Sequence, residues 1–258
     1  MDILTTIANN VLTISFNRPE KKNAITAAMY QLMADALIDA QTNNDVRVIL
    51  FTGSESIFTA GNDLEDFMKN ASQLSTDGDA SSIIQFMRAL INMPKPVIAA
   101  VSGLAVGIGT TMLMHCDLVY LADTAKLLMP FSQLGLCAEF SSSLLLPRVA
   151  GYHRAAEKLL LGEAFGAQEA FDMGMANKVL PAADLLAHAN LQAAKLVALP
   201  AASLRATKQL MKSSQSSLVN QVMADELEQF GKMLNAPEAK EAFMAFFQKR
   251  KPDFSKFA

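Results

Sequence analysis

Short apolar runs that alternate with helical patterns restrict the folds open to this chain more than any other feature of its sequence. Residues Val46–Thr52 form an apolar, β-branched run that ends at Gly53, which is the pattern of a buried parallel strand. A second run, Val97–Val101, follows two prolines that end the preceding helix, and a third occupies Leu118–Leu121. This alternation predicts an α/β core in which right-handed crossovers connect the strands.

The segments that flank these runs are predicted to be a hairpin and helices. An Asn9-Asn10 turn joins strands over Ile3–Ile7 and Val11–Phe16. Thr26 is placed to cap a helix that ends near Thr42, and its apolar face holds Met29, Leu32, Met33, Ala36 and Leu37. From residue 182 onward every segment has a helical pattern. We therefore expect a core over residues 1–198 and a helical region over residues 199–258.

Composition excludes several classes of function. Hydrophobic residues make up 51% of the 258 residues and charged residues 18%, so a large buried core is expected. The net charge is −3 and there is no basic tract, which argues against nucleic acid as a partner. Two cysteines, Cys116 and Cys137, are too few for a disulfide framework. The start of the chain lacks the pattern of a signal peptide, and glycines interrupt the apolar segment 97–114. We expect a cytoplasmic protein that has no membrane partner.

One acid, Glu139, lies among apolar and hydroxyl residues over 130–143, with no basic residue before Arg148. A carboxylate in such surroundings loses hydration, which raises its pKa toward neutrality. That property suits a group that must both accept and return a proton. The alternative is that Glu139 caps a helix, and the residues alone do not decide between the two.

Two glycine-bearing turns each follow a strand and precede a helix, at residues 58–64 and 103–109. Such turns present free backbone N–H groups at a helix N terminus, where together they could bind the oxygen of a thioester as its enolate forms. Each turn alone is better explained as a tight strand-to-helix connection. Neither matches a P-loop or a dinucleotide fingerprint, and the spacing of histidines and cysteines predicts no metal site. Asp63 and its acidic neighbours are expected to cap a helix start, and Asp117 to bind backbone groups.

Taken in order along the whole chain, these motifs resemble the crotonase superfamily, the enoyl-CoA hydratase/isomerase family. The matching segments are Asn17-Arg18-Pro19 with Asn23-Ala24, Ala60-Gly61-Asn62-Asp63, Pro94 to Ala99, Gly103 to Gly109, Cys116-Asp117, Ala170 to Ala176 and Phe247 to Phe254. The resemblance implies a spiral of ββα units followed by helices that mediate oligomerisation, as a homotrimer or a dimer of trimers.

The resemblance also implies roles for particular residues. The oxyanion-hole N–H groups fall on Asn62 and Ile108, and the loop Ala60, Gly61, Asn62, Asp63 and Leu64 lines the site for coenzyme A. That molecule enters as part of an acyl-CoA substrate, and no separate cofactor is expected. Lys249, Arg250 and Lys251 face its phosphates in this interpretation. A solvated helix end explains the basic trio equally well.

Departures from the family pattern narrow the expected reaction. Enoyl-CoA hydratases carry two glutamates at positions that hold Thr111 and Phe131 here. The Asn62-Asp63 pair, Ile108 and the segment before Glu139 resemble instead the Δ3,Δ2-enoyl-CoA isomerases of peroxisomal type, whose catalytic glutamate matches Glu139. Another crotonase-type reaction, such as hydration or thioester hydrolysis, and a non-catalytic acyl-CoA-binding module remain open. Acyl chain length is expected to depend on the loop over 68–81.

Overall fold

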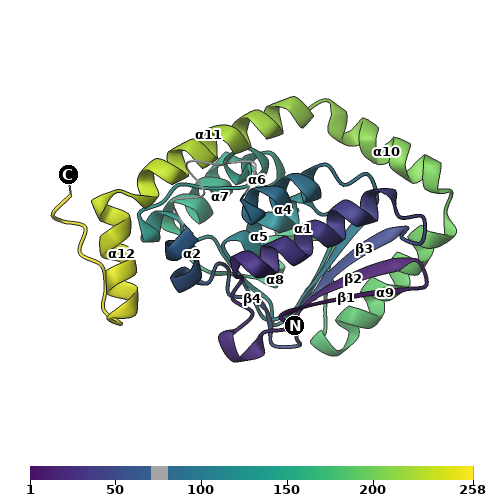
Figure 1. Cartoon of the computed structure of the whole chain (residues 1–258), viewed down its shortest axis with the longest axis horizontal. Helices are drawn as coiled ribbons and strands as arrows, with labels where there is room; N and C mark the ends of the chain where they lie inside the picture. The colour runs from purple at the N-terminus through teal and green to yellow at the C-terminus, as the bar shows by residue number, and fades with distance from the viewer. Residues whose placement is uncertain (71–80, 258) are drawn as a thin grey trace.

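The chain builds two sheets from strands that occur in pairs along the sequence (Figure 1). The computed structural model describes residues 1–70 and 81–257. The larger sheet has the order β1-β2-β3-β5-β7-β10, and the smaller one the order β4-β6-β8-β9. The bounds of the larger sheet are β1 (Ile3–Ala8), β2 (Val11–Phe16), β3 (Val48–Thr52), β5 (Val97–Val101), β7 (Leu118–Ala122) and β10 (Lys178–Leu180). Those of the smaller sheet are β4 (Ile57–Thr59), β6 (Leu104–Val106), β8 (Lys126–Leu128) and β9 (Phe165–Gly166).

Each turn of the chain adds one strand to each sheet. The pairs β3 and β4, β5 and β6, and β7 and β8 are consecutive in sequence but lie in different sheets. All neighbours are parallel except β1 with β2 and β8 with β9. This arrangement confirms the predicted spiral of ββα units.

Glycines mark two of the crossings between the sheets. A Cβ atom on Gly53 would lie 2.5 Å from the carbonyl oxygen of Ile57. A Cβ atom on Gly103, whose φ is +64°, would overlap the carbonyl oxygen of Ser56. Only a residue without a side chain lets the two crossings approach this closely. The crossings therefore bring the ends of neighbouring ββ units into contact.

Both faces of the inner strands β3 and β5 of the larger sheet are buried, which explains why these strands lack alternation. Ile49 and Phe51 pack into the cluster beneath α1 (Ala27–Thr42) and α4 (Ser82–Ile91). Val48 and Leu50, on the opposite face of the same strand, pack into the cluster under α9 (Ala182–Ala198). Figure 1 shows α1 and α4 on one side of the strands and α9 on the other. A parallel sheet needs such cover on both faces.

The remaining helical segments lie between strands or follow the last strand, β10. They are the 3-10 turn Pro19–Lys21, α2 (Leu64–Asn70), α5 (Ile108–Thr111) with the 3-10 turn Met112–His115, the 3-10 turn Ser132–Leu134, α6 (Ser142–Ala150), α7 (Tyr152–Ala156) with the π-helical turn Glu157–Leu161, α8 (Ala167–Asp172), α10 (Ala201–Ser213), α11 (Ser216–Leu234) and α12 (Pro237–Phe247). The last three form an arc over the core that ends beside the C terminus (Figure 1). The predicted boundary near residue 198 falls between α9 and α10, and a division into regions there stays a prediction.

Several local predictions agree with the structure and others were wrong. Asn9 and Asn10 both adopt positive φ in the hairpin turn, and the Thr26 hydroxyl accepts a hydrogen bond from the N–H of Met29. Leu32, however, is 42% exposed rather than part of the core. Segment 97–114 divides into β5, β6, α5 and part of a 3-10 turn. No described helix is long and apolar enough to span a membrane.

We predict that Gly103→Ala destabilises the protein more than Gly151→Ala. Both glycines have positive φ, but a Cβ atom on Gly151 meets nothing within 4 Å. Gly151 combines its positive φ with a ψ of 154°, a region that other residues rarely adopt, so the alanine there should cost only backbone strain of about 1–3 kcal/mol. The alanine at 103 adds a steric overlap worth roughly 1–3 kcal/mol more. Urea unfolding of the two variants measures the difference, and equal free energies of unfolding would contradict this view of the crossing.

Candidate active site

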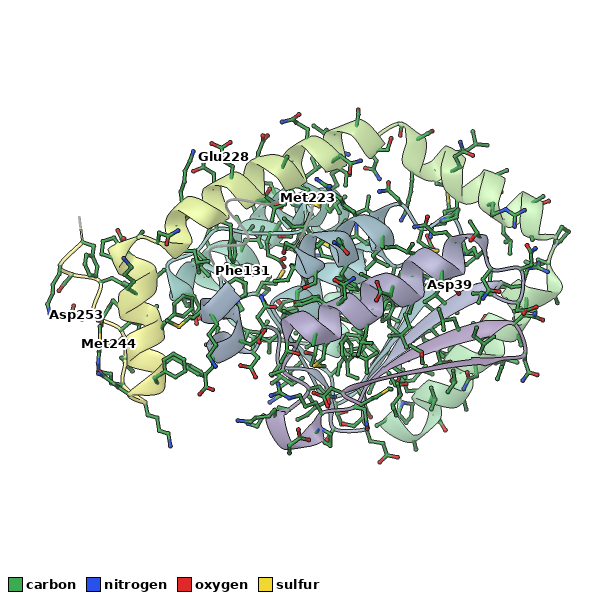
Figure 2. The ribbon with its side chains drawn as sticks, viewed as in Figure 1. Asp39, Phe131, Met223, Glu228, Met244 and Asp253 are labelled. Atoms are coloured by element: carbon green, nitrogen blue, oxygen red, sulfur yellow. The ribbon has the colours of Figure 1, made fainter. Side chains whose placement is uncertain are left out.

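A cavity of about 590 Å³ opens between the carboxyl ends of β4 and β6 and the C-terminal helices. Most of its wall is apolar, and aromatic side chains from α2, α11 and α12 contribute to it. Figure 2 shows Phe131 in the region covered by α11. The lining residues used below are Lys21, Lys22, Ala60, Gly61, Asn62, Asp63, Leu64, Phe67, Gly107, Ile108, Phe131, Leu136, Phe230, Phe243, Phe246 and Phe247.

The two glycine turns of the sequence meet at this cavity. Strands β4 and β6 are parallel neighbours, so the turns that follow them leave the same edge of the sheet. A Cβ atom on Gly61 would lie 2.8 Å from the carbonyl oxygen of Val106. Gly107, with φ of +56°, has open space where its Cβ would be. The first glycine permits contact between the turns, and the second keeps the cavity wall clear.

Backbone geometry directs two N–H groups away from the protein interior. Asn62 forms a parallel bridge with Ile25, in which the carbonyl of Gly61 and the N–H of Asp63 bind the backbone of Ile25. The N–H of Asn62 therefore lies on the opposite side of this segment. Ile108 is the first residue of α5, where an N–H has no acceptor within the helix. Both residues line the cavity. The arrangement offers two donors to an oxygen that gains negative charge.

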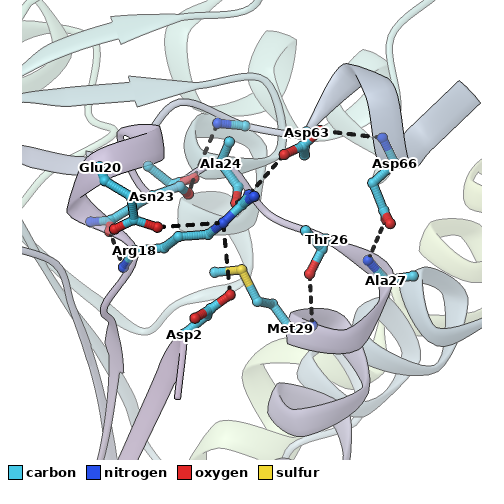
Figure 3. A network of polar contacts seen from close by, with 12 residues as sticks. Asp2, Arg18, Glu20, Asn23, Ala24, Thr26, Ala27, Met29, Asp63 and Asp66 are labelled. Carbon is cyan, nitrogen blue, oxygen red and sulfur yellow. Dashed lines mark hydrogen bonds and ion pairs between the residues drawn. The ribbon is translucent and has the colours of Figure 1, made fainter.

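Polar contacts fix the loop that carries Asn62 (Figure 3). Arg18 donates from Nη1 to Asp63 Oδ2 at 2.8 Å and to the carbonyl oxygen of Ala24 at 2.9 Å. The other oxygen of Asp63 accepts from the N–H of Asp66 in the first turn of α2. The guanidinium of Arg18 and these hydrogen bonds hold the pKa of Asp63 below its usual value, although partial burial opposes them. Asp63 thus caps a helix start, as predicted, and its side chain also anchors the loop.

A buried tyrosine joins this loop to the interior. The Tyr30 hydroxyl donates to Asn62 Oδ1 at 2.5 Å. Burial raises the pKa of Tyr30, and the nearby charge of Glu139 raises it further. Tyr30 is therefore a neutral donor that holds the Asn62 side chain. Sequence reasoning missed this residue, because a tyrosine on the apolar face of a helix gives no indication of a polar partner.

Glu139 is buried, with 6% of the residue exposed. The Thr111 hydroxyl donates to Glu139 Oε1 at 2.5 Å. Burial raises the pKa of Glu139 to about 8, the Thr111 hydrogen bond lowers it, and the charge of Glu226 raises it. Glu139 and Thr111 are not themselves among the residues that line the cavity. Ile108 and Leu136, which do line it, each lie three positions before one member of this hydrogen-bonded pair. A group with this pKa can exchange protons near neutral pH.

The cap at the start of α6 comes from another acid. Glu226, on α11, accepts from the N–H groups of Ser141 and Ser143 at 2.5 and 3.0 Å. It also accepts from the Ser143 hydroxyl at 2.5 Å. The helix-cap explanation of Glu139 is therefore wrong, because the Glu139 side chain bonds Thr111. Glu226 was missed because it lies 87 positions from Glu139 on a helix with many other polar residues.

The sequence profile of the enoyl-CoA hydratase/isomerase family matches residues 6–256. The chain belongs to this family. Enoyl-CoA delta isomerase 2 of Rattus norvegicus is 34% identical over 252 residues, which are 97% of this chain and 64% of the rat protein. The chain therefore spans less than two thirds of that relative.

Two further comparisons cover both proteins almost fully. The 1,2-epoxyphenylacetyl-CoA isomerase of Escherichia coli strain K12 is 32% identical over 258 residues, 98% of each chain. A crystal structure of an enoyl-CoA hydratase/isomerase from Pseudoalteromonas atlantica T6c aligns with a TM-score of 0.92 and 34% identity, covering 99% of this chain and all of that one. These matches confirm the crotonase fold.

Two groups of basic side chains are candidates for binding phosphate: the lysines before α1 and the basic trio after α12. Lys21 and Lys22 line the cavity, although sequence reasoning did not select them. Within the predicted basic trio, Arg250 forms hydrogen bonds to both carboxylate oxygens of Glu241 at 2.5 and 3.0 Å. Lys249 and Lys251 are exposed just after α12. Arg250 is thus held in an ion pair with Glu241, and phosphate binding by the trio stays a prediction.

We predict that Glu139→Gln stabilises the protein relative to wild type as the pH rises. A folded pKa of about 8 against an ordinary value of 4.5 means that only the folded state keeps this proton between those values. The stability that the group contributes is present below pH 4.5 and is lost as the pH rises through 8. The neutral amide avoids this loss, so the difference between variant and wild type should grow by about 2–4 kcal/mol from pH 5 to pH 9.

Urea unfolding at both pH values measures the effect. Glu228→Gln is the matched control, since that carboxylate is 66% exposed on the outer side of α11 (Figure 2). A Glu139→Gln difference that stays constant with pH would show that this carboxyl ionises normally in the folded protein.

Proposed function

We propose that the protein is a Δ3,Δ2-enoyl-CoA isomerase that uses Glu139 as its acid and base. The observation that carries the proposal is the buried Glu139 carboxylate, which has a pKa of about 8 and accepts a hydrogen bond from Thr111 of α5. The first residue of that helix, Ile108, lines the cavity together with Asn62. The other buried glutamate of the described chain, Glu226, is bound to the start of α6. A single proton-transferring carboxylate is sufficient for moving a double bond.

The proposed reaction conserves all atoms of the substrate. Glu139 removes a proton from C2 of a 3-enoyl thioester, and the C2–H electron pair forms a dienolate whose charge lies on the thioester oxygen. The N–H groups of Asn62 and Ile108 stabilise that oxygen, each by about 3 kcal/mol. The protonated Glu139 then returns the proton to C4, and the double bond is left between C2 and C3. Burial limits exchange of the proton with water in between.

Water addition requires a second acidic group, which the site does not offer at the corresponding positions. Thr111 donates its hydrogen bond to Glu139, and Phe131 is a buried part of the cavity wall. Neither side chain can accept a proton from water. Thioester hydrolysis would need a water molecule beside Glu139, where the surroundings are apolar. These features favour isomerisation over both alternatives.

The cavity also supports a proposal for how the substrate binds. Ala60, Gly61, Asn62, Asp63 and Leu64 all line it, as a coenzyme A-binding loop should. Lys21 and Lys22 supply positive charge beside that loop, and the exposed Lys249 and Lys251 follow the last helix. We expect these lysines to attract the phosphates of coenzyme A. The loop over 68–81, expected to set acyl chain length, lies largely outside the described residues.

A second candidate activity is isomerisation of an aromatic acyl-CoA. The relative that matches over 98% of both chains is a 1,2-epoxyphenylacetyl-CoA isomerase. Aromatic side chains form a large part of the cavity wall here, and Phe67 and Phe131 both contact Phe230 edge to face. An aromatic substrate could pack against this wall in the same way.

We further propose that the protein assembles as a homotrimer or a dimer of trimers. Apolar side chains remain exposed on the C-terminal helices, including Leu210, Met211, Met244, Phe246 and Phe247. Light scattering coupled to size exclusion should give three or six times the 27.8 kDa chain mass. A monomer at micromolar concentration would contradict this proposal.

We predict that Glu139→Gln lowers the kcat for 3-hexenoyl-CoA isomerisation by about 10²–10⁴-fold, because the amide cannot accept the proton. The KM should change little, since the oxyanion donors are backbone groups. Glu228→Gln, the exposed control, should retain wild-type kcat. Formation of the 2-enoyl thioester is followed by absorbance and confirmed by mass and NMR analysis of the product.

Product analysis over a panel of acyl-CoA substrates separates the candidate activities. Water adducts, free acids or turnover of epoxyphenylacetyl-CoA alone would each identify a different reaction of the family. Tight coenzyme A binding without turnover of any acyl-CoA would favour a non-catalytic binding module. Near-normal isomerisation by Glu139→Gln would refute the assigned role of this residue.

A further inference from the structure

The two residues that follow Glu139 adopt a backbone conformation that side chains disfavour. Phe140 and Ser141 have φ of 59° and 58°, and neither is a glycine. Each such residue costs about 1–2 kcal/mol unless its surroundings hold it in place. The consecutive pair turns the chain sharply between Glu139 and α6. The direction in which the Glu139 side chain leaves the backbone therefore depends on whatever maintains this bend.

Glu226 holds the far side of the bend. Its carboxylate accepts from the N–H of Ser141 and from both the N–H and the hydroxyl of Ser143. The Ser141 hydroxyl donates to the carbonyl of Val219, also on α11, at 2.8 Å. Glu226 is 7% exposed, so water does not replace these contacts readily. Helix α11 thus supports the bend through side-chain and backbone acceptors.

His115 holds the near side. Its Nε2 lies 2.8 Å from the carbonyl oxygen of Phe140, and its ring stacks on the Phe140 ring with centroids 4.1 Å apart. Burial lowers the pKa of His115 to about 3, so a neutral Nε2–H donates to that carbonyl. His115 follows Thr111, the partner of Glu139, by one helical turn. The segment that carries Thr111 and His115 therefore contacts both the Glu139 carboxylate and the bend.

We propose that Glu226 is a positioning residue for Glu139: from the C-terminal helix α11 it fixes the bend at Phe140–Ser141 and so aims the proposed base at the Thr111 hydroxyl and the cavity. Removing its carboxylate leaves the N–H groups of Ser141, just before α6, and of Ser143, in its first turn, without their acceptor. The bend then relaxes toward conformations that side chains prefer. This inference rests on the proposed role of Glu139, but its central readout does not require turnover.

The Glu226 carboxylate also acts on Glu139 through its charge. The charged and titratable groups around the pair are Tyr30 on α1, Cys137 in the preceding loop and His115 before β7. All three are neutral near pH 7, because burial raises the pKa of the phenol and the thiol and lowers that of the imidazole. Burial also raises the pKa of Glu226, while its hydrogen bonds from Ser143 and Ser141 lower it. The charge of ionised Glu226 raises the pKa of Glu139.

The test is a titration of the Glu139 carboxyl by NMR in protein labelled with ¹³C at glutamate, with the signal assigned by its absence in Glu139→Gln. In Glu226→Gln the midpoint should fall by about one pH unit from the wild-type value, because the neighbouring negative charge that raises it is lost. Glu228→Gln, the same substitution on the exposed side of α11, should leave the midpoint unchanged. An unchanged midpoint in folded Glu226→Gln would overturn the proposal.

The kinetics of 3-hexenoyl-CoA isomerisation provide a second test. Glu226→Gln should lower kcat by about 10- to 100-fold through misdirection of Glu139, with KM nearly unchanged and the acid limb of the pH profile moved to lower pH. If that variant does not fold, Ser143→Ala, which removes one of the three donors to Glu226, should lower kcat by a smaller factor at constant KM. A loss of thermal stability with wild-type kcat and pH profile would overturn the proposal. A wild-type protein without isomerase activity would refute the proposed function, while the NMR titration would still decide this inference.

Discussion

The buried carboxylate of Glu139 is the feature on which the site depends, since an ionised group at this position opposes folding unless its surroundings compensate for lost hydration. Thr111 provides one hydrogen bond to it, which is enough to place the carboxylate but too little to bring its pKa down to an ordinary value. The same environment that weakens the fold above pH 8 keeps the group able to exchange protons near neutrality. Thr111, at a position where the family resemblance places a hydratase glutamate, is the donor to Glu139.

Topology brings the other half of the site to this carboxylate. Parallel pairing of β4 with β6 places the Asn62 and Ile108 turns at one edge of the smaller sheet, and glycines at 61 and 107 let them meet there without side chains in the way. Arg18 and Tyr30 then hold the first turn from the N-terminal segments. The C-terminal helices add aromatic residues to the cavity and the acid that caps α6. Residues from both ends of the chain are therefore needed to complete the site.

The sequence predicted those parts of the fold and site that depend on residues close together in the chain, and it missed those that depend on distant partners. The Asn9-Asn10 turn, the Thr26 cap and the strands β3, β5 and β7 follow from turn chemistry, capping and apolar runs within short segments, and these were found. Strand β10 was not. Strands β4, β6, β8 and β9 have only two or three residues each, too few to show a period. Leu32 fits the helical apolar face by spacing, yet it lies where no other described element covers it. Glu226 and Tyr30 act on partners 85 and 32 positions away, and no local pattern encodes such pairings. The roles of Glu139, Asn62 and Ile108 came from the family resemblance.

The proposed mechanism places one carboxylate against the carbon skeleton of a thioester whose oxygen is bound by two backbone N–H groups. The most direct measurement is a crystal structure of Glu139→Gln with bound 3-hexenoyl-CoA, which the variant should not convert. The account predicts the thioester oxygen within hydrogen-bond distance of the N–H groups of both Asn62 and Ile108, with the side chain at 139 facing C2 and C4. A thioester oxygen bound elsewhere, or a different ionisable side chain against C2, would contradict it.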